Sequence, residues 1–545
     1  METEERIASL REVEQTREER LYKSYPRMNK SEKRTVLEEY HPDYVESACE
    51  TLRLGVNKGD KVIKEFVSLL YGKPIISDKV INLDNPDYET DVLVIGGGGA
   101  GAAAAITAKE RGADVLIVTK LRMGDSNTVM AEGGIQAADG PNDSPAIHYI
   151  DAFGGGGYAA KPQLLKKLVL EAPEAIAWLI GLGVVFDKNA DGEPVTSHGG
   201  GTSKKRMHAC KDATGLEIMR TLKSEVSCKG IPVAEYSFAV EIIKDENGNA
   251  AGAVLANTET GGLSVVKAKT VIIATGGAGR LHCQGFPTSN HYGATADGLA
   301  IAYRAGAKLI CADTLQYHPT GVAEPSRMLG ALVTEKVRAL GAQLVNKNGE
   351  AFVNPLEPRD VTAAAIIREC KLGNGIKTAN GFGVWLDTPM IEIVNGEGTI
   401  EKRLPSTFST FEKAGIDIRK EPILVYPTLH YQNGGIEIDE NCEAVGVKNL
   451  FACGEAAGGI HGRNRLMGNS LADIIVFGKT AGMVAAERSK DIRVGKLTLE
   501  HVEEWEKELE KAGVKTAEFS PRILPDYIYP QDQSRVSISD DQEKF

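Results

Sequence analysis

Cysteine is scarce in this sequence: there are eight cysteines among 545 residues, and none stands in a CxxC or CxxCH spacing. This pattern excludes a disulfide scaffold, a zinc ribbon and a c-type haem. It also leaves no ligand set for an iron–sulfur cluster within the chain. We therefore expect no metal site and a reducing, cytoplasmic setting.

Long apolar runs are also missing. The uncharged run 92–108 contains four consecutive glycines and is typical of strand, turn and helix. The run 175–186 is too short to cross a bilayer, and the acidic N-terminus lacks the apolar core of a signal peptide. We expect no direct membrane span, and any membrane contact would be peripheral, through partner subunits.

The chain has no excess of basic residues: 63 Lys and Arg stand against 75 Asp and Glu, a formal net charge of -12. This balance argues against nucleic-acid binding, which depends on basic patches. The length predicts about three to four domains. Glycine, in contrast, is plentiful, with 59 residues gathered in short clusters.

Those glycine clusters follow short apolar segments. Strands are predicted at 92–95, 115–118, 270–274 and 450–452, and a helix at 102–111. Strands that alternate with helices indicate a parallel α/β sheet. Glycines at the carboxyl ends of such strands are typical of a ligand site.

Gly96-x-Gly98-x-x-Gly101 lies between the first strand and its helix, as in a dinucleotide-binding turn. The next strand ends in Val118-Thr119-Lys120, without the acidic residue that commonly binds the ribose of NAD. FAD, which needs close backbone approach at several strand ends, is therefore the better prediction.

The two ends of the chain differ from this pattern. Residues 1–73 are rich in Glu, Lys and Arg at loose helical spacing and predict a helical extension. This extension is either a docking or dimer-forming arm or a solvated arm without a role. A helix is predicted after Glu500, with Val502, Trp505 and Leu509 on one face. The polar tail after 515 is expected to cover the surface or to be partly disordered.

Histidine and arginine gather in five turn-like segments, 317–321, 334–338, 358–360, 430–431 and 461–465. A guanidinium binds a carboxylate through two parallel hydrogen bonds, so several arginines beside a flavin suggest a small dicarboxylate. Taken singly, each of these residues is equally consistent with an ordinary hydrogen-bonding role. From the residues alone, His318 is the candidate acid/base.

Ten motifs in order extend this pattern from about Asp91 to about Arg488: DVLVIGGGGAG, NTVMAEGGI, KDATG, ATGGAGR, YHPTG, VTEKVRALG, PRDV, PTLHYQNGGI, FACGEAAGGIHGRNRL and GNSLAD. Together they resemble the flavoprotein subunit of the succinate dehydrogenase/fumarate reductase family. That family also includes L-aspartate oxidase and thiol-driven fumarate reductases.

The resemblance implies an α/β fold with a Rossmann-like FAD-binding domain interrupted by an α+β capping domain. It places the FAD-binding domain at 91–310 and 428–490 and the capping domain at 311–427. The flanking regions are a helical N-terminal extension (1–73), a linker (74–90) and a short helical C-terminal region with a tail (491–545).

The resemblance also assigns the site residues. Substrate carboxylates would be bound by His318, Thr334, His430 and Arg465. Arg359 would be the general acid, which receives its proton through Glu335 and Arg338. Non-covalent FAD would be held by Gly96, Gly98, Gly101, Thr119, Lys120, Asn127, Thr128, Gly133, Gly134, Thr275, Gly276, Gly277, Asp297, Glu455, Arg465, Ser470 and Leu471.

Two positions depart from the family pattern. Asn127 stands where membrane-bound members attach FAD through a histidine, which favours non-covalent FAD and fumarate reduction over succinate oxidation. His198 stands where aspartate oxidases carry a glutamate that contacts the substrate amine, which weighs against that activity.

The predicted function is therefore that of a fumarate reductase/succinate dehydrogenase flavoprotein subunit. It would transfer hydride between flavin N5 and fumarate or succinate and exchange electrons with a separate iron–sulfur subunit. L-aspartate oxidase is the alternative enzyme. A non-catalytic flavin electron-transfer subunit is the third reading, disfavoured because all seven substrate-binding and catalytic residues are present. The physiological direction and homo-oligomer formation stay open.

Overall fold

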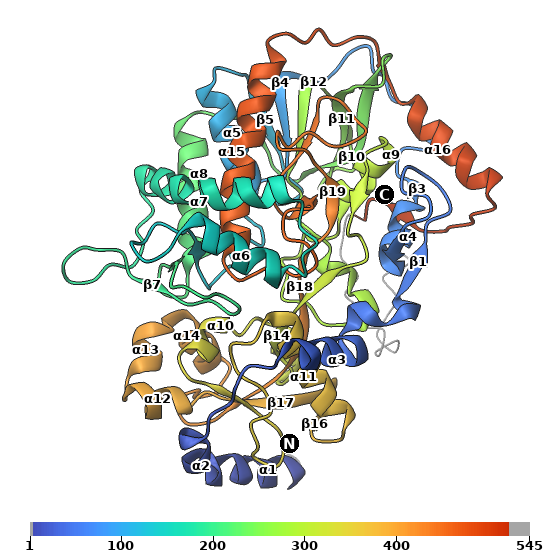
Figure 1. Cartoon of the computed structure of the whole chain (residues 1–545). Helices are drawn as coiled ribbons and strands as arrows, with labels where there is room; N and C mark the ends of the chain where they lie inside the picture. The colour runs from blue at the N-terminus through green and yellow to red at the C-terminus, as the bar shows by residue number, and fades with distance from the viewer. Residues whose placement is uncertain (1–3, 523–545) are drawn as a thin grey trace.

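The computed structural model describes residues 4–522 (Figure 1). A large mixed sheet lies at the top of the view and a smaller sheet with short helices lies below it. Among the described residues, none of the helices combines the length and the apolar composition that crossing a bilayer takes.

The large sheet has the strand order β22-β10-β11-β12-β4-β5-β9, with β20 also paired to β12. Its strands are β4 (Tyr88–Ile95), β5 (Val115–Val118), β9 (Val233–Ala234), β10 (Ser237–Asp245), β11 (Ala250–Asn257), β12 (Leu263–Ile273), β20 (Leu450–Ala452) and β22 (Leu497–Thr498). The predicted strands pair in parallel, with Ile95 opposite both Val118 and Ile273.

The sequence pattern had suggested a parallel sheet, but the sheet is mixed. Strands β10, β11 and β12 are antiparallel to one another and β22 is antiparallel to β10. The loops 246–249 and 258–262 are too short for the crossover that parallel strands need. These local turns decide the direction of the strands.

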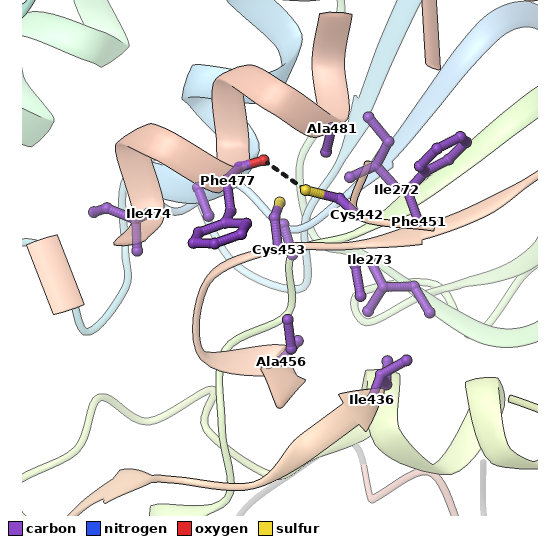
Figure 2. Packing of buried hydrophobic residues seen from close by; sticks show 14 of the residues in the cluster. Ile272, Ile273, Ile436, Cys442, Phe451, Cys453, Ala456, Ile474, Phe477 and Ala481 are labelled. Atoms are coloured by element: carbon purple, nitrogen blue, oxygen red, sulfur yellow. Dashed lines mark hydrogen bonds between the residues drawn. The ribbon is translucent and has the colours of Figure 1, made fainter. Parts of the chain in front are cut away.

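Helices cover the parallel part of the sheet. Helix α5 (Gly99–Glu110) packs against α15 (Asn469–Ser489) at close range: a Cβ at Gly482 would overlap the Ala104 carbonyl. Beneath α15, Cys442 and Cys453 are buried with Phe477 among isoleucines of the sheet (Figure 2). Both thiols behave there as small apolar groups.

Further elements surround this core. They are α6 (Pro145–Gly155), α7 (Pro162–Leu182), α8 (Thr214–Cys228), α9 (Asp297–Arg304) and the short strands β6 (Ile135–Gln136), β7 (Thr196–Ser197), β8 (Met207–His208), β13 (Leu309–Ile310), β19 (Gly435–Glu437) and β21 (Ala457–Gly458). Strands β6, β8 and β7 form one small sheet, and β13, β19 and β21 form another.

The smaller unit, which we call the cap, has an antiparallel sheet of order β14-β18-β17-β15, with β16 paired to β17. Its elements are β14 (Leu315–Val322), β15 (Gln343–Val345), β16 (Ile376–Thr378), β17 (Gly381–Asp387), β18 (Ile423–Gln432), α10 (Glu335–Ala339), α11 (Arg359–Lys371), α12 (Met390–Asn395), α13 (Thr399–Arg403) and α14 (Pro405–Lys413). Strand β18 runs across the position predicted as the boundary between the cap and the returning FAD-binding segment.

The N-terminal extension is helical with one small hairpin. It comprises α1 (Glu4–Gln15), α2 (Arg17–Tyr22), α3 (Lys30–Tyr40), the hairpin of β1 (Cys49–Thr51) and β2 (Lys61–Ile63), α4 (Lys64–Leu70) and β3 (Lys73–Pro74). Figure 1 shows α1–α3 beside the cap and α4 beside α9. The extension therefore packs against the cap and the large domain, and a docking or dimer-forming role stays a prediction.

At the C-terminal end, α16 (Glu500–Lys511) buries Val502, Trp505 and Leu509, as its spacing predicted. Strand β23 (Phe519–Ser520) then pairs in parallel with β3. The polar tail is therefore ordered as far as the structure describes it, and its residues 523–545 lie outside the described part.

Candidate active site

A deep cavity lies at the carboxyl ends of β4, β5, β12 and β20, and its wall begins with the glycine turn. Gly96 has φ +123°, a conformation that suits glycine. A Cβ at Gly101 would overlap the Gly96 carbonyl oxygen, so that turn tolerates no side chain there. The turn leads directly into the N-terminus of α5, where backbone amides favour a phosphate.

Most of the predicted cofactor residues line this cavity: Gly96, Gly98, Thr119, Lys120, Asn127, Thr128, Thr275, Gly276, Asp297, Glu455, Arg465, Ser470 and Leu471. They come from segments far apart in the chain. The folding of the sheet brings them together, because all of them follow strand ends or open α9 and α15.

Four of the predicted glycines do not line the cavity. Gly101 faces the Gly96 carbonyl, Gly133 faces Met467, and a Cβ at Gly277 would overlap Glu455. Gly134 has φ +126° and packs against the backbone of β8. These glycines permit close packing behind the wall.

Buried polar groups without partners in the cavity wall suit a dinucleotide. Thr275 Oγ1 and Asn290 Oδ1 are buried without a hydrogen-bond partner, and both residues line the cavity. At the end of β5, the Lys120 ammonium lies 2.6 Å from Asp297 Oδ2. A ribose and a pyrophosphate offer the hydroxyls and charge that such groups bind.

Asn127 is fully engaged at the position where some family members carry a histidine. Its Nδ2 donates to Glu455 Oε2 at 3.1 Å, and its Oδ1 accepts from the backbone amide of His291 at 2.6 Å. The side chain thus joins two walls of the cavity. An amide has no nucleophilic nitrogen, so it cannot anchor a flavin covalently.

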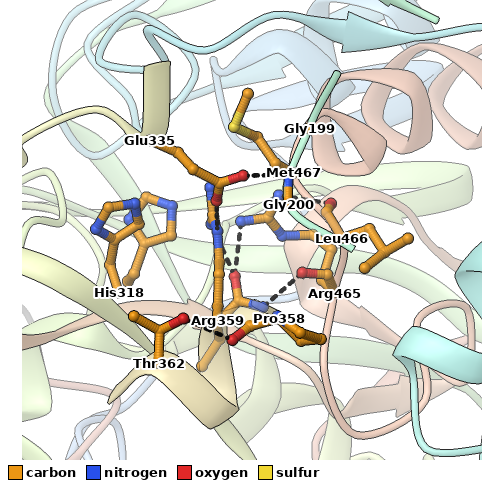
Figure 3. A network of polar contacts seen from close by, with 12 residues as sticks. Gly199, Gly200, His318, Glu335, Pro358, Arg359, Thr362, Arg465, Leu466 and Met467 are labelled. Atoms are coloured by element: carbon orange, nitrogen blue, oxygen red, sulfur yellow. Dashed lines mark hydrogen bonds and ion pairs between the residues drawn. The ribbon is translucent and has the colours of Figure 1, made fainter. Parts of the chain in front are cut away.

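Beside the cavity, two buried arginines converge on one amide oxygen (Figure 3). Gln316 Oε1 accepts from Arg359 Nη1 at 3.0 Å and from Arg465 Nη2 at 2.9 Å. Arg359 begins α11 of the cap, and Arg465 lies in the loop before α15. The pair therefore joins the cap to the cavity wall.

Glu335 is the acidic partner in this cluster. Its Oε2 accepts from Arg359 Nε at 2.9 Å and lies 3.6 Å from Arg338 Nη2, and its Oε1 accepts from the backbone amide of Gly200. Burial raises the pKa of Glu335, but the charges of Arg359 and Arg338 outweigh it, so the pKa lies below its usual value. Glu335 is therefore ionised at neutral pH.

Arg338 is fully buried, and it donates to the carbonyl of Pro355. Burial lowers its pKa to about 10, although Glu335 acts in the opposite direction. This guanidinium is therefore closer than an ordinary arginine to releasing a proton.

Two neutral histidines complete the cluster. The rings of His318 and His430 are 5.0 Å apart. Burial, reinforced by the charge of Arg359, holds both pKa values well below the usual histidine value. Ser289 Oγ lies 2.8 Å from His430 Nδ1, whereas His318 Nε2 is buried without a partner. A ligand atom would satisfy it.

Two positions that were predicted for the site from the sequence are arranged differently from the residues of this cluster. Thr334 is buried as the N-cap of α10, where its hydroxyl faces the Lys336 amide. His198 is exposed, while Gly200 two residues later contacts Glu335. In this arrangement the backbone after His198, and not its ring, touches the cluster.

Gln316 was not predicted from the sequence as a site residue. It stands two residues before His318 on the same strand, so the two side chains lie on one face of β14. That spacing is the signal that could have found it. The cluster as a whole holds three guanidinium groups against one carboxylate, and its excess positive charge suits a dianion.

Comparisons with known proteins identify the family of the chain. The model of the FAD binding domain family matches residues 91–471. An uncharacterized FAD-dependent oxidoreductase of Methanocaldococcus jannaschii is 43% identical over 409 residues, covering 73% of this chain and 72% of the relative. A fumarate reductase (CoM/CoB) subunit of Methanothermobacter marburgensis is 39% identical, and the match covers 83% of this chain and 82% of the relative.

Among solved structures, FrdA of Escherichia coli quinol fumarate reductase superposes with a TM-score of 0.69. It is 33% identical, and the match covers 78% of this chain and 74% of that one. Within residues 4–522, no group of three or more His, Cys, Asp or Glu residues is placed to hold a metal ion. The cofactor of the protein is FAD.

Proposed function

The chain belongs to the family of FAD-binding flavoproteins that includes fumarate reductases, succinate dehydrogenases and L-aspartate oxidases, and on that premise we propose that it interconverts fumarate and succinate. The observation that carries the proposal is the pair of buried arginines bonded to Gln316 beside two neutral histidines. Such an arrangement suits a substrate with two carboxylates.

Bound FAD would supply or accept the hydride in this reaction. The chain holds it through the amides of the glycine turn, the Lys120–Asp297 pair and the residues that open α15. Asn127 leaves the cofactor non-covalent. The cluster of arginines and histidines lies next to the same cavity, because Arg465 and His430 line both.

Substrate binding falls to four side chains in this proposal. Arg465 binds one carboxylate through two parallel hydrogen bonds from its guanidinium group. The neutral rings of His318 and His430 donate hydrogen bonds, and the Thr334 hydroxyl contributes another. The positive potential withdraws electron density from the double bond and stabilises charge that develops during the reaction.

Arg359 is the proposed proton donor to the substrate carbon. It is joined to ionised Glu335 and, through it, to Arg338. After Arg359 gives up its proton, Glu335 passes one on from Arg338, whose lowered pKa of about 10 eases the transfer. Succinate oxidation follows the same path in reverse.

Electrons would reach the flavin from a separate iron–sulfur protein. The support is the cysteine content: the eight cysteines show no cluster-binding spacing, and those that the structure describes are all free thiols. A separate carrier is then needed to deliver single electrons.

The test is anaerobic. FAD-loaded protein is reduced with a viologen dye, and flavin re-oxidation is followed on addition of fumarate. Arg359→Ala should slow re-oxidation at least about 100-fold with FAD still bound, because it removes the general acid. Arg220→Ala, which removes an arginine from the surface of α8, is the matched control and should leave the rate unchanged.

Failure of fumarate to re-oxidise the wild-type flavin would overturn the proposal. Bleaching of oxidised flavin by L-aspartate, without bleaching by succinate, would instead assign the chain to the L-aspartate oxidases.

A further inference from the structure

The substrate arginine Arg465 rests on an aromatic ring. Its Cζ lies 4.4 Å from the centroid of Tyr431, which directly follows His430 on β18. Both side chains are buried, with Arg465 3% and Tyr431 8% exposed. A guanidinium over a tyrosine face is attracted by the negative face of the ring, and the attraction grows when water is excluded.

The phenol hydroxyl of this tyrosine is itself held. Tyr431 donates to Asp473 Oδ2 at 3.2 Å, and His461 Nε2 lies 3.1 Å from the same oxygen. Asp473 is completely buried on α15. The same helix carries Ser470 and Leu471, which line the FAD cavity.

Arg465 makes few other favourable contacts. It donates to Gln316 Oε1 and to the carbonyl of Leu466, and its Nε is buried without a partner. Burial lowers its pKa to about 9, and Arg359 adds to the effect. The ring of Tyr431 is therefore one of the few favourable contacts of this charge.

We propose that Tyr431 and Asp473 are positioning residues that hold Arg465 ready for a substrate carboxylate. Asp473 fixes the ring through the phenol hydroxyl, and the ring fixes the guanidinium by stacking. Partial transfer of charge from the carboxylate to the phenol makes the ring face more negative, which strengthens the stacking. This inference rests on the proposed dicarboxylate function.

Removal of the ring should weaken substrate binding more than turnover. Tyr431→Leu is expected to raise the KM for fumarate about tenfold, the loss of one buried cation–π contact. Tyr431→Phe keeps the ring and should restore most of that loss.

A double-mutant cycle tests the role of Asp473. Tyr431→Phe removes the donor of this hydrogen bond and Asp473→Asn removes the charge of its acceptor. Once the phenol hydroxyl is gone, the second change should raise KM little further, so the two together should raise KM about as much as Tyr431→Phe alone. The matched control is Tyr303→Phe, which removes another buried tyrosine hydroxyl, one that donates to the carbonyl of Leu54. It should leave KM unchanged.

Binding is also measured without turnover, by titrating oxidised FAD-loaded protein with succinate and following the flavin absorption. Wild-type affinity in Tyr431→Leu, or independent KM effects in the cycle, would overturn the inference. If Tyr431→Leu fails to retain FAD, the cycle of the two conservative variants decides. A wild-type protein inert toward both dicarboxylates would instead mark failure of the proposed function.

Discussion

At the scale of the residue, Gln316 explains how the active site holds two like charges together. Its amide oxygen accepts from Arg359 and Arg465, while its Nε2 donates to Asn464 and to the carbonyl of Arg465. Two guanidiniums in a buried site repel each other. The proposed dicarboxylate would relieve this repulsion, so the arrangement that is unfavourable in the free site would favour the bound one.

The glycine turn yields a prediction for one residue. Gly101→Ala should abolish FAD binding, because its Cβ would overlap the Gly96 carbonyl and force the turn apart. Gly181→Ala is the matched control: it also lies in a helix, α7, but a Cβ there meets nothing within 4 Å. The control should keep its FAD and gain about 1 kcal/mol in stability.

The measurement is the flavin-to-protein ratio after purification, with thermal unfolding of both variants. Stoichiometric flavin in Gly101→Ala would mean that the turn has another conformation.

Single residues of the site were predictable where a short motif carried them. The glycine turn, His318 and Arg465 all lie in such motifs. The spacing from His318 could have placed Gln316 on the same face of β14. Its contact with Arg465, 149 residues away, and the contact of Tyr431 with Asp473, 42 residues away, were not predicted. No local pattern of a sequence encodes such a contact.

At the scale of the element, one buried carboxylate helps to attach α1 and α2 to the cap. Asp387, completely buried at the end of β17, accepts from Arg17 at 2.9 Å and from Arg20 at 2.7 Å. Val13 packs nearby among buried side chains of the cap. These contacts turn a highly charged segment into an ordered part of the fold.

Asp387→Ala should therefore release these two helices. Removal of the carboxylate leaves two arginines without their partner, one of them 3% exposed, at a cost of about 3 to 5 kcal/mol. Limited trypsin digestion should then cut at Arg17 and Arg20 first. Glu38→Ala breaks an exposed pair with Arg34 and should leave the pattern unchanged.

If digestion of Asp387→Ala and of the wild type proceeds alike, the other contacts hold the arm, among them those of Val13 and the hydrogen bonds of Ser9 and Thr16 to cap carbonyls.

Element predictions succeeded where the pattern was local. The helix after Glu500 buries the face that its spacing indicated. The direction of β10 and β11 was missed, because the alternation of strands and helices elsewhere suggested a parallel sheet. The partner of the N-terminal helices was also missed, since charge composition does not specify which surface a helix meets.

At the scale of the whole molecule, the N-terminal arm ties the cap to the large domain. Its first helices bind the cap through Asp387, and its later part reaches the other side: Tyr303 donates to the carbonyl of Leu54, and Glu65 accepts from the Gln284 amide. The active site takes Arg359 from the cap and Arg465 from the cavity wall. The arm therefore contacts both the cap and the large domain, and the relative position of these two units must be fixed for the site to be complete.

Three buried histidines predict how the whole fold responds to acid. Burial lowers the pKa of His41 to about 3, of His148 to about 4 and of His501 to about 3. In the unfolded chain each would bind a proton near pH 6.5. Below that pH the unfolded state takes up protons that the folded state refuses, so stability falls as the pH falls toward the folded pKa values.

His148→Gln isolates one of these contributions. Glutamine keeps a donor for Asn469, which His148 meets through Nε2 at 2.9 Å. The difference in unfolding free energy between variant and wild type should be constant above pH 7. Below pH 6.5 it should shift in favour of the variant by up to about 1.4 kcal/mol per pH unit until about pH 4. Urea unfolding of the FAD-loaded proteins between pH 8 and pH 4.5 measures it. A difference that stays constant over that range would mean that folding does not lower the pKa of His148.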